Sequence, residues 1–232
     1  MRVDRTGSGP PITLPDGTVV PRLPSYDRWL WDGDFCGVIG FRWQPGTNEL
    51  PPYILGHIGF AVVPWKRRRG YGTEALRLLT KALPAHAAKP DDMPTRLDLQ
   101  FGMWLSIGAG TSGVGTGASH GIGHVLGAAC HVPHGHTSCV MLPSVLRWNL
   151  PANAERQSRV SDAFGKPDVP AADLVASLVK TLGLPRRLSE VGVGPDRFRE
   201  IAEKSMHDRA VLNNPRPIAG PDQVKEILEL AA

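Results

Sequence analysis

The sequence predicts an α+β protein in which a small antiparallel β half-domain precedes an all-α helical domain. Three observations support this prediction. The first 65 residues hold short runs of strand-forming residues that are separated by turn signals. From about Gly72 onward, apolar residues recur at helical spacing instead. Three segments near the C-terminus begin with Pro and carry an acidic residue in the next turn, which is typical of helix starts.

Three stretches of the first part are expected to be strands. "DGTVVPRL", residues 16–23, has a turn signal followed by β-branched residues. "FCGVIGFRW", residues 35–43, is a short apolar run, and "YILGHIGFAVVPW", residues 53–65, is a second one that Pro64 stops. If the sheet remains open, the strand near Ile58 to Val63 becomes an unpaired edge, which favours aggregation.

Helices are expected throughout the remainder of the chain. "TEALRLLTKALPAH", residues 73–86, places its leucines on roughly one face, and "RLDLQFGMWLSIGA", residues 96–109, continues as helix. Pro170, Pro195 and Pro221 mark the starts of three more helices, in residues 169–185, 194–207 and 220–232.

The composition excludes several classes of protein. The 232 residues carry a net charge of +4, which is mild and gives no dense basic face for nucleic acid. Cys36, Cys130 and Cys139 are too few and too scattered for a disulfide framework, so a reduced, cytoplasmic setting is expected. The start lacks the apolar core of a signal peptide, and no window has eighteen unbroken apolar residues.

A basic run, "VVPWKRRRGYGTEAL", stands where the pattern changes from strand to helix. Backbone amides at a helix N-terminus bind phosphate well, and arginines add positive charge. Read by itself, such a run is most often a solvated basic turn.

Residues 12–76, however, resemble the GNAT N-acetyltransferase family in "LPDGTVVPRLP", "WDGDFCGVIGFRWQPGT" and "LGHIGFAVVPWKRRRGYGTEAL". The resemblance implies a truncated acetyl-CoA-binding segment, residues 1–76, because nothing after Leu83 matches the rest of that fold. The cofactor contacts that it implies are Val63, Arg67, Arg69, Gly70, Tyr71 and Gly72.

Five of the eight histidines lie in one segment, "ASHGIGHVLGAACHVPHGH", residues 118–136. His120 and His124 are four residues apart, so they share one face of a helix. His134 follows in a turn after which Thr137 or Ser138 is expected to begin the next helix. Two imidazoles on a helix and a third from the following turn suit a metal site or a proton relay. The spacing is weak evidence by itself, since a buried histidine is usually a satisfied core residue and no HExxH or CxxC motif is present.

The same segment carries a second resemblance. "RLDLQFGMWLSIGAG", "GASHGIGHVLGAACHVPHGHTSCVMLPSVLRWN" and "NNPRPI" are similar to the C-terminal helical domain of the iron-containing alcohol dehydrogenases, in the maleylacetate-reductase-like branch. This domain has the dehydroquinate synthase-like fold and would span residues 77–232, with the join between residues 70 and 84.

This second resemblance implies a divalent metal (Fe or Zn), with His120 and His134 as two of its ligands. His124 would lie beside the nicotinamide and the substrate and relay a proton while NAD(P) exchanges a hydride. The partners implied are a small-molecule substrate and a second subunit in a homodimer. His131 is interpreted as a surface residue and His136 as a support for the ligands, and Ser144 replaces a histidine common in the family.

The family's nicotinamide-binding domain and its first Asp and His ligands lie upstream of the matched region, so the site is expected to be incomplete. Cys130, His136, Asp91 and Asp92 are the candidates to supplement it. "GVGTGA", residues 113–118, imitates a dinucleotide fingerprint but has helical surroundings. Three hypotheses therefore remain open: a metal-dependent dehydrogenase, a truncated acetyltransferase, and an inactive fusion of the two.

Overall fold

The structure, a computed structural model, describes most of the chain. The described residues are 2–4, 9–13, 17–31, 33–47, 51, 58–62, 70–110 and 115–232. Their contacts divide the chain into two compact units. The first comprises residues 1–69 and 107–112, and the second comprises residues 70–106 and 113–232.

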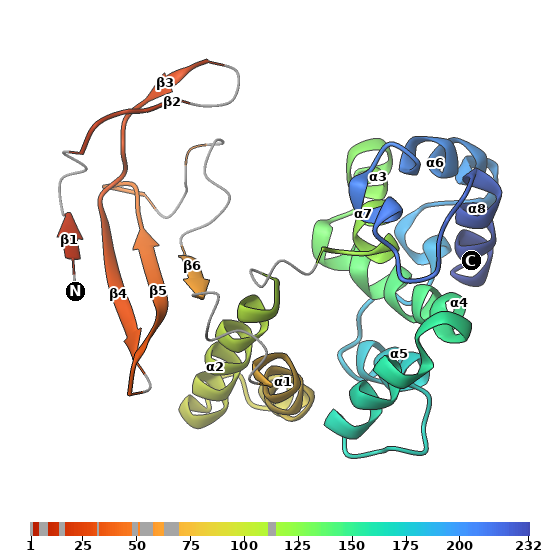
Figure 1. The fold of residues 1–232 in the computed structure, drawn as a ribbon, viewed down its shortest axis with the longest axis horizontal. Coiled ribbons are helices and arrows are strands. Elements are labelled where there is room, and N and C mark those ends of the chain that lie inside the picture. Colours follow the sequence, from red (N-terminus) through yellow and green to blue (C-terminus); the bar gives the residue numbers. More distant parts are fainter. Residues whose placement is uncertain are drawn as a thin grey trace. The chain divides into compact units, whose positions relative to one another are not determined.

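Antiparallel strands make up the first unit (Figure 1). A four-stranded sheet has the order β1-β4-β5-β6, and a separate ribbon pairs β2 with β3. Within the sheet, Trp29 stands opposite Val38, and Ile39 stands opposite Phe60. Gly33 has a φ of 98° between β4 and β5, a backbone angle that glycine adopts without a steric penalty. The strands are β1 (Arg2–Asp4), β2 (Ile12–Thr13), β3 (Val19–Val20), β4 (Ser25–Trp31), β5 (Phe35–Arg42) and β6 (Ile58–Val62).

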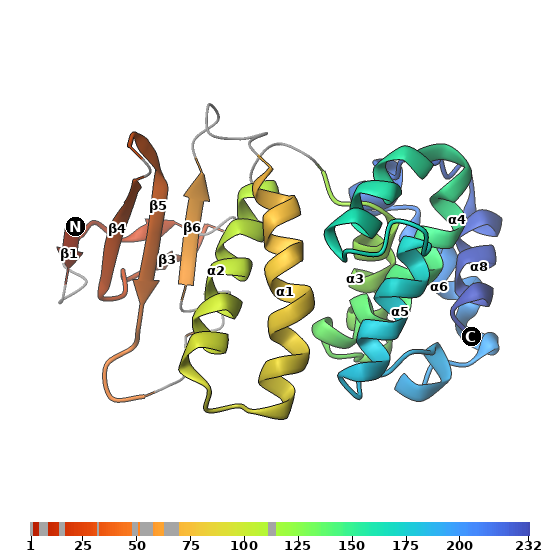
Figure 2. The ribbon, with the colours of Figure 1, turned by 90° about the horizontal axis from the view of Figure 1, so that it is seen from below.

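The second unit is helical (Figure 2). It contains α1 (Tyr71–Ala88), most of α2 (Met93–Gly110), α3 (Ala118–Cys130), α4 (His134–Ala163), α5 (Ala171–Thr181), the 3₁₀ turns η2 (Leu188–Val191) and η3 (Pro195–Arg197), α6 (Phe198–Ser205), α7 (Arg209–Leu212) and α8 (Pro221–Leu230). None of the helices in the described part of the chain combines the length and apolarity that a membrane crossing requires. The predicted α+β class, with strands first and helices after, is confirmed.

The hydrophobic core of the helical unit lies among α3, α4, α6 and α8. Ile122 and Leu126 of α3 are fully buried against Met141, Ile201 and Ile227. Each such side chain contributes about 1.5–3 kcal/mol when it is removed from water. All the residues of this core cluster lie between Ala118 and Ala231, so the core is built without the strands.

The longest helix, α4, is bent. Asn153 has a non-helical φ of −144°, two residues after Pro151, which has no amide hydrogen to donate. The buried Gln157 donates from Nε2 to the Leu146 carbonyl (2.7 Å) and to Asn153 Oδ1 (2.9 Å). A side chain therefore satisfies polar groups beside the bend.

Candidate functional site

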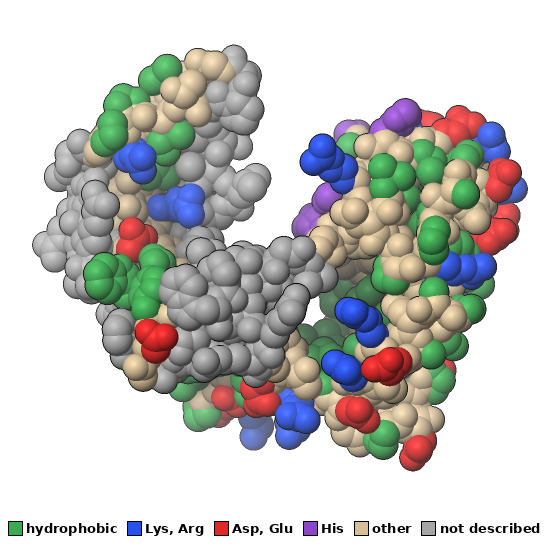
Figure 3. Space-filling view, in the orientation of Figure 1, with side chains coloured by type: hydrophobic (Ala, Val, Ile, Leu, Met, Phe, Trp, Pro, Cys, Tyr) green, Lys and Arg blue, Asp and Glu red, His purple; other side chains and the backbone are tan. Residues whose placement is uncertain are grey.

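Three histidine rings meet at one end of the helical unit. Their ring centroids are 5.5 Å apart for His120 and His124, 5.6 Å for His120 and His134, and 6.2 Å for His124 and His134. His124 and His134 are exposed, and His120 is half-buried. Figure 3 shows histidine side chains in purple at the part of the surface where α3 lies. We call His120, His124 and His134 the histidine cluster.

The link between α3 and α4 returns His134 to the other two rings. His131 ends α3 in the left-handed conformation, with a φ of 55°, and the next residue, Val132, is buried. Pro133 then caps α4, which begins at His134. The prediction that Thr137 or Ser138 begins this helix was wrong. The Pro133 carbonyl already accepts hydrogen bonds from the amides of His136 and Thr137, and the buried Thr137 hydroxyl donates to the His134 carbonyl within the first turn.

Two glycines between the histidines allow α3 to approach its neighbours closely. A Cβ atom on Gly121 would lie 2.6 Å from Val211 Cγ2 and 2.9 Å from the Val211 amide nitrogen in α7. A Cβ atom on Gly123 would lie 2.9 Å from Thr137 Oγ1 in α4. Real Cβ atoms do not come so near to other atoms. The segment His120–His124 therefore packs against α7 on one side and α4 on the other because it has no side chains at these two positions.

The close approach to α7 brings His124 to Asp208. His124 Nδ1 lies 2.8 Å from Asp208 Oδ2, and Asp208 Oδ1 caps α7 by accepting from the Ala210 amide at 2.8 Å. Burial acts to raise the pKa of Asp208, but the hydrogen bonds from His124 and Ala210 lower it below its ordinary value. The ionised carboxylate only accepts hydrogen bonds, so Nδ1 of His124 carries the proton and Nε2 is left as the acceptor in the neutral ring.

The electrostatic environment of His120 is different. Burial lowers its pKa, and positive charge on His124 and His134 lowers it further, while Asp208 has a small opposing effect. At neutral pH His120 is therefore an uncharged imidazole, the form that binds metal ions.

Buried amides hold the start of α3 in place. Asn214 Oδ1 accepts from the Ala118 amide and from Asn149 Nδ2, both at 3.1 Å, and its Nδ2 donates to Asn149 Oδ1 at 2.6 Å. The guanidinium of Arg216 lies 4.0 Å from the centroid of the Trp148 ring, a cation–π contact, and donates to the Trp148 carbonyl at 2.8 Å. The "NNPRPI" segment thus anchors α3 and α4 to each other.

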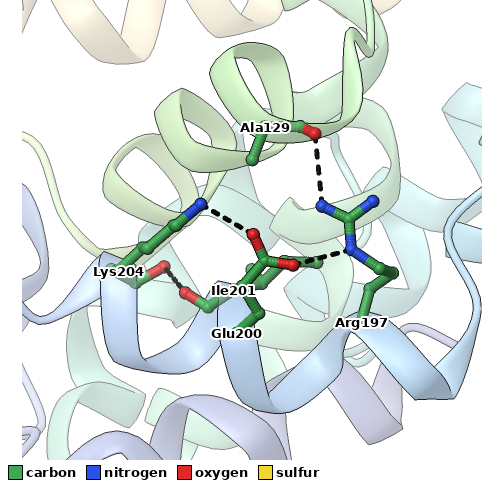
Figure 4. A network of polar contacts seen from close by, with 6 residues as sticks. Ala129, Arg197, Glu200, Ile201 and Lys204 are labelled. Carbon is green, nitrogen blue, oxygen red and sulfur yellow. Dashed lines mark hydrogen bonds and ion pairs between the residues drawn. The ribbon is translucent and has the colours of Figure 1, made fainter.

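An ion-pair network anchors the other end of α3 (Figure 4). Arg197 donates to the Ala129 carbonyl at 3.3 Å, in the last turn of α3, where helix carbonyls have no partner within the helix. Glu200 holds Arg197 at 2.8 Å and is itself paired with Lys204 at 2.6 Å. The positions of His120 and His124 are therefore fixed by contacts at both ends of their helix.

The spacing of the rings in the histidine cluster is compatible with two of them sharing a metal ion. Two imidazoles on one tetrahedral ion would have ring centroids about 5 Å apart, given metal–nitrogen bonds of about 2.1 Å. The 5.6 Å between His120 and His134 fits this spacing, and so does the 5.5 Å between His120 and His124. Among the described residues, no group of three or more His, Cys, Asp or Glu side chains is placed to hold a metal ion. Cys130, His136, Asp91 and Asp92 are all described, so none of them completes the pair.

The other predicted site residues are distributed as follows. Val63, Arg67 and Arg69 lie outside the described residues, as does the side chain of Tyr71. Gly70 caps α1 with a φ of 81°, and Gly72 is exposed in its first turn.

His131 is exposed and His136 is half-buried. Ser144, buried beneath α8, donates to the Leu230 carbonyl at 3.0 Å. Within "GVGTGA", residues 115–117 lead into α3 and residues 113 and 114 are outside the described residues.

Asp208 is the site residue that sequence reasoning missed. It lies 84 positions from His124, so no local pattern connects the two. The available signal was an Asp directly before a short helix, which is a common capping position but one that does not reveal its second partner.

Two family models match the sequence. Residues 70–232 match the C-terminal model of the Fe-containing alcohol dehydrogenase family, and residues 13–93 match the acetyltransferase (GNAT) family. Both models cover residues 70–93, where α1 lies.

Similar proteins are considerably longer. Maleylacetate reductase 1 of Cupriavidus pinatubonensis is 33% identical over 140 residues, which cover 60% of this chain and 38% of that protein. The maleylacetate reductase of Burkholderia cepacia is 33% identical over 232 residues, covering 97% of this chain and 61% of that one. An iron-containing alcohol dehydrogenase of known structure from Corynebacterium glutamicum has a TM-score of 0.62 and 28% identity, over 69% of this chain and 44% of that chain. The chain spans about half the length of the curated relatives that it matches.

The packing of α3 predicts that Gly121→Ala is destabilising. The new methyl group would meet a backbone nitrogen as well as Val211 Cγ2, so α3 and α7 must separate, at a cost of about 1–3 kcal/mol in the free energy of unfolding. Gly127→Ala is the matched control in the same helix, because its Cβ atom would meet only the Val132 carbonyl oxygen, at 3.6 Å. This control is expected to be neutral or to stabilise by about 0.5–1 kcal/mol. Urea unfolding measures both, and equal effects would contradict the packing argument.

The environment of His120 predicts a pH dependence. In chelator-treated protein, the NMR titration midpoint of its ring is expected below the ordinary value of 6.5. Between the lowered pKa and 6.5, the unfolded chain binds more protons than the folded chain. The contribution of His120 to the free energy of unfolding is therefore lost as pH falls from 6.5 toward the lowered pKa. His124→Gln should raise the midpoint by removing a neighbouring positive charge, and His131→Asn, outside the histidine cluster, should leave it unchanged. A midpoint at or above 6.5 would refute the prediction.

Proposed function

Because the chain belongs to the Fe-containing alcohol dehydrogenase family, we propose that its helical unit is the metal- and substrate-facing half of an NAD(P)-linked oxidoreductase acting on a small molecule. Residues 77–232 are assigned to this role, and residues 1–76 to a partial GNAT-like segment. The observation that carries the proposal is the histidine cluster, in which a neutral imidazole and one oriented by a carboxylate lie side by side.

His120 and His134 have separate roles from His124 in this proposal. The first two are metal ligands, and a metal bound there supplies a Lewis acid for the substrate oxygen. His124 moves the proton. Asp208 holds its Nδ1–H, so Nε2 is available to accept a proton from a substrate hydroxyl or to return one to it. The exposed position of His124 leaves its ring accessible to a substrate.

Turnover requires more than the described residues provide. A catalytic zinc ion, for example, takes three protein ligands, and the histidine cluster supplies two. In the proposal, the remaining ligands and the nicotinamide-binding surface correspond to the part of the longer relatives that this chain does not match.

Zinc binding by the full chain tests the assignment without requiring activity. Purified without chelators or a histidine tag, the chain is expected to bind one added Zn²⁺, more weakly than a complete site would. The double variant His120→Ala/His134→Ala should lose this binding, because both ligand imidazoles are removed. The matched control, His131→Ala/His136→Ala, also removes two histidines of the same segment but should keep it. Plasma mass spectrometry after gel filtration gives the metal content per chain. Equal binding by the two double variants would refute the ligand assignment.

Acetyl-CoA binding at the loop before α1 is the second candidate function, favoured by the match of residues 13–93 to the GNAT family. The left-handed Gly70 opens α1, and apart from its chain neighbours no atom of the described residues lies within 4 Å of the position of a Cβ, so the backbone is open to a ligand phosphate on that side. Calorimetry with acetyl-CoA should show binding that Arg67→Gln/Arg69→Gln weakens at least about tenfold, through lost charge-assisted contacts. Arg159→Gln/Lys166→Gln, with the same change in charge, is the control. If acetyl-CoA does not bind, or if both double variants bind alike, the loop is only a basic turn.

A further inference from the structure

A pocket lies in the helical unit, formed by α4, α5, the segment after α5 and the C-terminal residues. Its volume is about 430 Å³. Buried residues line part of it, namely Pro143, Ser144, Val179 and Ala231. None of His120, His124 or His134 is among the lining residues, so the pocket is distinct from the histidine cluster.

Four cationic side chains line this pocket, and no Asp or Glu side chain does, although Ala232 with its main-chain carboxyl group also belongs to the lining. The four are Arg147, Lys180, Arg186 and Arg187. They come from separate parts of the chain: α4, the last turn of α5, and the two positions before η2. Figure 3 shows Lys and Arg side chains in blue at the part of the helical unit where α5 lies, with acidic side chains beside them.

Three of these cations have no acidic partner among the described residues. Arg147 is paired with Asp173 at 2.8 Å, but no ion pair involves the side chain of Lys180, Arg186 or Arg187. The three side chains are exposed, and the Glu190 carboxylate nearby accepts from the Arg186 backbone amide at 3.1 Å. Positively charged side chains around one pocket, with no ion-pair partner of their own, favour an anion there. Two of the three are arginines, whose planar donors match the oxygens of phosphate in pairs.

We propose that this pocket binds a small phosphate-bearing anion, whose oxygens contact Lys180, Arg186 and Arg187 while the rest of the ligand covers the Pro143 and Val179 side of the pocket. Inorganic phosphate and a phosphate monoester share the required chemistry. Arg147 reaches the same pocket from α4 but is partly neutralised by Asp173. The site uses no residue of the histidine cluster, so it does not depend on the dehydrogenase proposal.

Calorimetry on the full chain at constant ionic strength is the first test, with inorganic phosphate and phenyl phosphate as probes. One binding event is expected, weakened about fivefold or more by Lys180→Gln and by Arg187→Gln. Lys166→Gln and Arg159→Gln are the matched controls, exposed residues that carry the same charge but do not line the pocket. Tighter binding of phenyl phosphate would identify an organic monoester, and equal binding would identify free phosphate. Asp173→Asn should tighten binding about two- to fivefold by releasing Arg147.

Cys139 gives a local measurement, because this thiol lines the pocket. Burial raises its pKa, so alkylation is followed at pH 8.5 or above and each cysteine is resolved by peptide mass spectrometry. Phosphate should slow the alkylation of Cys139 at least about threefold and leave Cys130, which does not line the pocket, unchanged. The proposal is overturned if phosphate slows neither cysteine or both equally, or if the control variants weaken phosphate binding as much as Arg187→Gln does.

Discussion

The close packing of α3 against α7 and α4 is the constraint on which the candidate site depends. Gly121 and Gly123 alternate with His120, Ile122 and His124, so one short segment serves three purposes. The glycines allow two helix contacts, the fully buried isoleucine fills the core, and the histidines occupy the open face. Any side chain at Gly121 would increase the separation of His124 from Asp208, because Asp208 caps the helix against which that glycine packs.

Within the histidine cluster, similar side chains acquire different properties from their neighbours. His120 is half-buried beside two rings that can carry positive charge, so its neutral form is favoured. His124 is exposed, and its ring is oriented by the hydrogen bond from Nδ1 to an ionised carboxylate. A ring oriented by a carboxylate therefore lies next to a ring whose neutral form is favoured.

The sequence predicted the class of fold and the helical segments that begin near Pro170, Pro195 and Pro221, since these follow from local periodicity and capping. At Pro195 the segment opens with the 3₁₀ turn η3, and α6 follows from Phe198. It also predicted that His120 and His124 share a helix face. It missed the strand β4, because in "SYDRWLW" an acidic and a basic residue separate the apolar ones. It also misplaced the start of α4. The contact between His124 and Asp208 could not be predicted from the sequence. Contacts between residues far apart in the chain depend on how the helices pack, and local sequence patterns do not specify that packing.

The helical unit can position the histidine cluster without help from the strands. The residues of its core cluster all fall between Ala118 and Ala231, and the contacts that fix both ends of α3, from Asn214 and from Arg197, come from the same range. His124 and His134 remain exposed on this rigid support, which leaves them free for further ligands or for a substrate. The arrangement of the three rings is therefore a property of the helical unit, whereas the proposed catalysis would also need groups from outside the histidine cluster.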